Sequence, residues 1–131
     1  MTAPVELVRA FYSAIAQGDV PGVLGLLHPQ LEWTEAEGFP YYSGTWTHPH
    51  EIVDKLLMPV SRDWASFSVV AERFLADGDR VISFGAYKAT HKATSKSVVA
   101  PLVHVWGVQD GKIKSFEMYT DTLLIHRAMQ A

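Results

Sequence analysis

The chain has 131 residues and a formal net charge of −3, with 48% hydrophobic and 19% charged residues. These values fit one globular domain spanning residues 1–131 and exclude a disordered chain, and the lack of a basic stripe argues against nucleic-acid binding. There are no cysteines, which excludes disulfides and thiolate metal sites.

The N-terminal segment MTAPVELVRAFY has no basic stretch followed by an apolar block, which a signal peptide requires. No apolar run approaches the ~18 residues of a membrane-spanning helix. We therefore expect a cytoplasmic protein whose partners include neither a membrane nor a nucleic acid.

Two helices are predicted first along the chain. From residue 4 to about 17, apolar residues recur at three- and four-residue spacing, which predicts an amphipathic helix. Asp19 is suited to cap a second helix. That helix should stop at His28, because the residue before Pro29 is driven out of helical geometry.

A strand is predicted over residues 31–36, LEWTEA, and its alternation places Glu35 on the same side as Leu31 and Trp33. A carboxylate that shares a face with a leucine and a tryptophan has two explanations. Either that face meets solvent at its end, or it lines a cavity that uses an acid.

A third helix is predicted to end at the Met-Pro pair at 58–59, and runs rich in β-branched and aromatic residues follow from about residue 66. Asp-Gly pairs at 77–78 and 110–111 are hairpin signals, and a short helix is predicted to begin near Asp121. Helices followed by hairpin-linked strands predict an α+β fold with a curved antiparallel sheet. Helices across one face of such a sheet enclose a pocket.

Three segments, in this order, resemble the nuclear transport factor 2-like superfamily, and most closely its SnoaL-like, polyketide-cyclase-like branch. They are AFYSAIAQGDVPGVLGLL, EWTEAEGFPYYSGTW and APLVHVWGVQDGKIKSFEMYTDT. The resemblance covers nearly the whole chain and implies a cone-shaped sheet with three N-terminal helices. It does not fix the function, because this fold hosts isomerases, cyclases, dehydratases, hydrolases and binding proteins.

Ketosteroid isomerase belongs to the same superfamily, and its general base corresponds in position to Glu35. Its two oxyanion donors correspond to Phe11 and Val103, neither of which carries a polar side chain. Tyr12 follows Phe11 but lies about 100° further round the helix. The resemblance thus implies Glu35 as the base, with Tyr12 or a backbone amide left to polarise a carbonyl.

SnoaL-like cyclases use an aspartate as acid and base, and Asp121 is the aspartate near the C-terminal end of this chain. Strand alternation puts Phe116, Met118 and Thr120 on one face and Asp121 on the other. Asp121 therefore reaches a cavity lined by the first set only if a bulge reverses the parity. It also fits the N-cap of the last helix, so catalysis and capping both stay open.

Aromatic and apolar side chains are the candidates for the pocket wall, although aromatic residues more often belong to the core. Trp33 and one of Tyr41 or Tyr42 are expected near the pocket mouth. The expected substrate-binding set is Trp33, Phe11, Tyr42, Val103, Phe116 and Met118.

The six histidines do not suggest a metal site, which needs three or four converging donors. A proline separates His48 from His50, and we expect no metal. His104 lies between two valines and is expected to point away from the valine face, onto the outer face of the sheet. The resemblance implies that a partner subunit packs on that face, so a homodimer is expected.

Two functions remain open from the sequence. The first is a small-molecule pocket protein that acts as a cofactor-free isomerase, cyclase or dehydratase by proton transfer on a small hydrophobic substrate. The second is a non-catalytic ligand-binding or dimerisation module of the same fold. The acid at the base position favours the first, and the empty donor positions favour the second.

Overall fold

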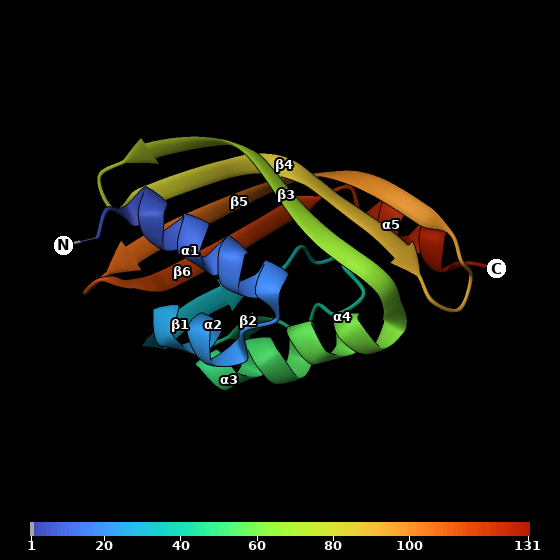
Figure 1. The fold of residues 1–131 in the computed structure, drawn as a ribbon, viewed down its shortest axis with the longest axis horizontal. Coiled ribbons are helices and arrows are strands. Elements are labelled where there is room, and N and C mark those ends of the chain that lie inside the picture. Colours follow the sequence, from blue (N-terminus) through green and yellow to red (C-terminus); the bar gives the residue numbers. More distant parts are fainter. Residues whose placement is uncertain (1) are drawn as a thin grey trace.

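A curved six-stranded sheet organises the fold, and the computed structural model describes residues 2–131 of the chain (Figure 1). The strands are ordered β2-β1-β6-β5-β4-β3 across the sheet. Their bounds are β1 Leu27–Thr34, β2 Thr45–Trp46, β3 Trp64–Asp77, β4 Arg80–His91, β5 Ser97–Gln109 and β6 Lys112–Thr120.

Most of the helices lie on the concave side of this sheet, where α1 packs against β3 and β4 (Figure 1). A continuous helical segment over residues 49–63 lies beside them and contacts β3. No helix among the described residues is long and apolar enough to cross a membrane. The helices are α1 Pro4–Gln17, α2 Val20–Leu26, α3 Pro49–Ile52, the π-helical η1 Val53–Leu57, α4 Met58–Asp63 and α5 Thr122–Met129.

The predicted helix over residues 4–17 agrees with α1, which ends where Gly18 adopts a left-handed φ of 65°. Asp19 caps α2 by accepting a hydrogen bond from the backbone N–H of Gly22. The following strand starts earlier than residue 31, at Leu27, and ends at Thr34. It tolerates Pro29 because its register with β6 shifts in this stretch.

The third helix does not end at the Met-Pro pair at 58–59, as the sequence suggested, but continues to Asp63. The turn before the proline is π-helical, and the N–H of Met58 donates to the carbonyl of Val53. Pro59 follows directly after this turn and has no N–H to donate to it. The wider turn therefore carries the helix past a residue that would otherwise stop it.

The sheet is mixed, because β1 pairs in parallel with β6, whereas all other neighbouring strands of the sheet pair antiparallel. Trp33 lies opposite Phe116 in this parallel pair, and their rings stack with centroids 3.8 Å apart. Both predicted hairpins form, and Asp110 and Gly111 have the positive φ angles of a tight two-residue turn. The parallel pair ties the N-terminal third of the chain to its last strand.

The sheet bends sharply where β3 and β4 pair. The register between these strands shifts between Ala71 and Arg73, which is the mark of a bulge. Gly85 of β4 faces this point, and a Cβ atom added there would lie 1.9 Å from the carbonyl oxygen of Val70. Only glycine allows this approach, so the curvature around the concave face depends on a missing side chain.

Candidate functional site

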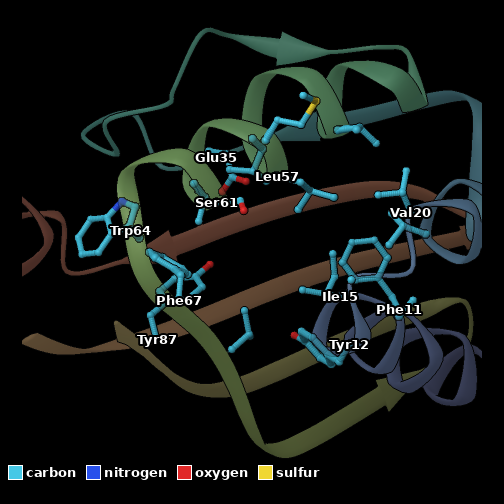
Figure 2. Close-up of a pocket in the computed structure, with 18 of the residues that line it drawn as sticks. Phe11, Tyr12, Ile15, Val20, Glu35, Leu57, Ser61, Trp64, Phe67 and Tyr87 are labelled. Carbon is cyan, nitrogen blue, oxygen red and sulfur yellow. The ribbon is translucent and has the colours of Figure 1, made fainter. Parts of the chain in front are cut away.

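The concave face of the sheet and the helices enclose a cavity of about 500 Å³ with a largely apolar, aromatic wall. Figure 2 shows Glu35 and Leu57 in the upper part of the view and Tyr12 and Tyr87 in the lower part. The roof is formed by η1 and α4, and the floor by α1 and the inner side of β4 and β5. This size suits a small organic molecule.

Glu35 lies directly after β1, and its side chain lines the cavity although only 6% of the residue is exposed. The indole N–H of Trp33 donates to Glu35 Oε1 at 3.1 Å, and within residues 2–131 the carboxyl has no other hydrogen bond and no ion pair. Burial raises the pKa of the Glu35 carboxyl to about 7, against the opposing effect of the Trp33 bond. The carboxyl can therefore take up or release a proton near neutral pH.

A second polar group lies across the cavity, on α1, β4 and β5. The hydroxyl of Tyr12 is 2.6 Å from His104 Nδ1, and the hydroxyl of Tyr87 is 2.7 Å from His104 Nε2. Both ring nitrogens of the histidine are thus engaged by tyrosines. Burial lowers the pKa of His104 to about 3, so the imidazole is neutral at physiological pH.

Ser83 extends this group behind the wall. Its Oγ lies 2.6 Å from the hydroxyl of Tyr12 and accepts a hydrogen bond from the indole N–H of Trp106 at 2.9 Å. Ser83 and His104 are directly opposite in the pairing of β4 with β5, which explains how one tyrosine reaches both. The result is a connected chain of hydrogen bonds from Trp106 to Tyr87.

His104 is therefore not on the outer face of the sheet, where the sequence placed it. Residues 102, 104 and 106 of β5 are buried toward the cavity side, and Val103 faces outward beside Tyr119 of β6. Val103, which was expected to bind substrate, does not line the cavity for the same reason. Strand alternation separated the two faces of β5 correctly. The valines on the outer face, Val103 and Val105, wrongly predicted a buried inner face there.

Three of the expected substrate-binding residues do line the cavity, namely Phe11, Trp33 and Phe116. Met118 lies on the inner face, but it lines a second hollow together with Tyr42, and this hollow shares Glu35 and Phe116 with the cavity. Tyr42 is 38% exposed and does not line the main cavity, so its expected position is corrected.

The neighbouring Tyr41 also lies outside the cavity wall. Its hydroxyl donates to Asp63 Oδ2 at 2.8 Å and accepts from the indole N–H of Trp64 at 3.2 Å. Tyr41 thus ties the loop after β1 to the end of α4.

Asp121 is the N-cap of α5, and its Oδ1 accepts a hydrogen bond from the backbone N–H of Leu124 at 3.2 Å. Its side chain does not line the cavity. Asp121 was interpreted either as a helix cap or as a catalytic residue, and the structure has the geometry of the cap. The β5–β6 pairing has no bulge next to Asp121 that would turn it toward the cavity.

Several cavity residues were not expected from the sequence. Tyr87 and His104 line the cavity from neighbouring strands, and Ser61 and Leu57 line it from the helical roof. Ser83 lies on the same face of the sheet, behind the cavity wall. The alternation V-I-S-F-G-A-Y from Val81 to Tyr87 carried the signal, because a buried serine and a tyrosine interrupt an otherwise apolar face. Within residues 2–131 no cluster of three or more histidine, cysteine or acidic side chains could hold a metal ion.

Comparison with known proteins places this geometry among relatives. A family described as SnoaL-like domain matches residues 8–116. The chain is 36% identical to a nuclear transport factor 2-like protein from Burkholderia thailandensis, with full coverage of both chains and a TM-score of 0.95. It is 26% identical to TerC, which was co-crystallised with polyporic acid, over 98% of this chain and 100% of that chain, with a TM-score of 0.87.

A protein from Jannaschia that is described as a SnoaL-like polyketide cyclase, at 15% identity, shares the fold with a TM-score of 0.84 over 98% of this chain and 92% of that chain. No curated protein matches the chain.

Proposed function

The chain belongs to the SnoaL-like domain family, and from this premise we propose that its cavity binds a small hydrophobic or aromatic molecule and moves a proton on it without a cofactor. The observation that carries the proposal is the buried carboxyl of Glu35, which has a single hydrogen bond and no cationic partner among residues 2–131. A carboxylate without a partner is costly to bury, and this cost raises the pKa of the carboxyl toward neutral pH. The carboxyl can then take up and release a proton there. Such groups concentrate at functional sites.

Two further facts support a small organic ligand. The cavity wall is mostly apolar and aromatic. TerC, a relative at 26% identity, was co-crystallised with polyporic acid. Both agree with a ligand held mainly by apolar contact and oriented by a few polar groups.

In the proposed reaction Glu35 removes a proton from a carbon next to a carbonyl group of the ligand. The C–H bond breaks, its electron pair forms a C=C bond, and the carbonyl π pair moves onto oxygen. Glu35 then returns the proton to the same carbon, which gives exchange, or to a different carbon, which gives isomerisation. In ring closure the enolate carbon instead forms a C–C bond to a second carbonyl carbon of the ligand, the π pair of that carbonyl moves onto its oxygen, and Glu35 returns the proton to that oxygen. A carboxyl with a pKa near the working pH serves both steps.

The test is hydrogen–deuterium exchange at the acidic carbon of 2-tetralone in D₂O, followed by proton NMR. We expect the wild-type protein to speed exchange above the buffer rate and Glu35→Gln to return it to that rate. Glu32→Gln is the matched control, since Glu32 is exposed on β1, three residues before Glu35, and its replacement removes the same charge. Equal exchange in wild type and Glu35→Gln would refute the role of Glu35.

The alternative is a binding module without catalysis. It is favoured by the self-contained polar wall, in which no buried side-chain nitrogen or oxygen of the described residues lacks a partner. Binding of 2-tetralone with no exchange above buffer would select this alternative. Absence of any binding would remove both functions.

A further inference from the structure

The hydroxyl of Tyr87 has one protein partner among the described residues, and that partner is His104. The other tyrosine of the network differs, because Tyr12 contacts both His104 and Ser83. A phenol has one proton to donate and lone pairs to accept with. Tyr87 therefore keeps one hydrogen-bonding function unused by the protein, and its side chain lines the cavity.

The neutral imidazole of His104 decides which function that is. It carries one N–H and one lone pair, yet both of its nitrogens are within hydrogen-bond distance of a tyrosine hydroxyl. One tyrosine must donate to the ring and the other must accept from it. Only two complete arrangements of the protons are possible.

In the first arrangement Tyr87 donates to Nε2 of His104, and Nδ1–H donates to Tyr12, which donates to Ser83. Tyr87 then presents only a lone pair to the cavity. In the second, Ser83 donates to Tyr12, Tyr12 donates to Nδ1, and Nε2–H donates to Tyr87. The proton of Tyr87 is then free and meets no acceptor among the described residues, so it is available to a ligand.

The second arrangement aligns every donor in one direction. It starts at the indole N–H of Trp106, passes through Ser83, Tyr12 and His104, and ends at the hydroxyl of Tyr87. Hydrogen bonds in such a chain polarise one another, which strengthens the last donor. This stronger donor stabilises most an acceptor oxygen atom that gains negative charge.

We propose that Tyr87 is the donor for a carbonyl or enolate oxygen of the ligand, with His104 and Tyr12 as positioning residues that act through it. The proposal rests on the proposed function, and it deepens it by naming the substrate class as a ketone or its enol. Glu35 would then work on the carbon next to the oxygen that Tyr87 holds. Tyr87 and Glu35 both line this cavity.

The test compares two probes that differ only in the carbonyl group, 2-tetralone and tetralin. We expect Tyr87→Phe to weaken binding of 2-tetralone about tenfold, the effect of losing one hydrogen bond in a dry site, while tetralin binding stays within about twofold. The matched control is Tyr41→Phe, which also removes a hydrogen-bonded hydroxyl but lies outside the cavity. It should leave both affinities unchanged.

A second measurement reports the proton arrangement itself. Bound 2-tetralone can only accept, so ¹⁵N NMR of His104 should show the Nε2–H tautomer in the complex. Bound tetralin should not impose it. In wild-type protein the carbonyl ¹³C resonance should also move in the direction of hydrogen bonding.

The outcomes separate the two proposals. Unchanged 2-tetralone affinity in Tyr87→Phe, or a carbonyl resonance like that in an apolar solvent, overturns the role of Tyr87 and leaves the proposed function standing. Failure of both probes to bind wild-type protein overturns both. Should Tyr87→Phe not fold, the tautomer and carbonyl signals of the wild-type complex decide the question alone.

Discussion

Replacing Glu35 by glutamine should change how the free energy of unfolding depends on pH. The buried carboxyl has a pKa of about 7, raised from its ordinary 4.5. Between these values the folded state holds a proton that the unfolded chain has released. The stability linked to Glu35 is therefore full below pH 4.5 and is lost as pH rises toward 7.

His104 acts in the opposite direction. Its pKa is about 3 in the folded state, lowered from 6.5. Between these two pH values the unfolded chain therefore binds a proton that the folded state does not bind. Stability linked to His104 is full above pH 6.5 and is lost on acidification. From pH 4.5 to 6.5 the two slopes cancel, and the free energy of unfolding of the wild-type protein should be nearly flat.

Glu35→Gln keeps the acceptor for the Trp33 indole but removes the titration. The His104 slope of about 1.4 kcal/mol per pH unit should then appear across this window. Relative to wild type, the variant should gain about 3 kcal/mol between pH 4.5 and 7, from 2.5 units of pKa shift at 1.36 kcal/mol each. This is an upper bound, because water can enter the cavity. It corresponds to a melting-temperature difference of about 10 °C for a chain of 131 residues.

The assay is urea and thermal unfolding followed by circular dichroism at half-unit steps from pH 4.5 to 7.5, with Glu32→Gln as the control for loss of a surface charge. Asp63, whose pKa of about 2 is held down by Arg62, titrates below this window. A difference between variant and wild type that stays constant with pH would mean that Glu35 is solvated in the fold. The argument for it as an acid–base group would then lose its physical basis.

Three other changes have defined outcomes. Asp121→Asn should melt nearly like wild type and Asp121→Ala a few degrees lower, since only alanine loses the cap of about 1 kcal/mol; equal melting of both would contradict the capping role. Gly85→Ala should cost about 3 kcal/mol in denaturant unfolding because its Cβ meets a backbone carbonyl, whereas Gly25→Ala in α2, with open space around it, should not destabilise. Light scattering should show that the wild-type protein is a dimer, formed through the outer sheet face, where Val99 is 61% and Tyr119 53% exposed. Val99→Asp should be a monomer. A wild-type monomer at high concentration would refute this.

The sequence predicted best where periodicity and burial coincide. The helix over 4–17 follows from apolar spacing, and Glu35 was predicted to share a face with Trp33 from strand alternation. His104 was misplaced because both faces of β5 are apolar, so alternation could not say which face is inside. The network of His104 with Tyr12 and Tyr87 brings together residues 92 and 17 positions apart in the chain, which no local pattern reveals.

The helical segment over residues 53–57 has a consequence for how cavities of this kind can change. A π-helical turn holds one more residue than an α-helical turn, as if one residue had been inserted into an ordinary helix. Deleting one residue there would restore the α-helical turn, and the residues after it would keep the faces that they present now. Ser61 would stay in the roof of the cavity. The same deletion in an ordinary α-helical turn would rotate everything after it by about 100° and bring different side chains to the roof. The π-helical turn is therefore the place where this helix can lose a residue while the wall of the cavity stays the same.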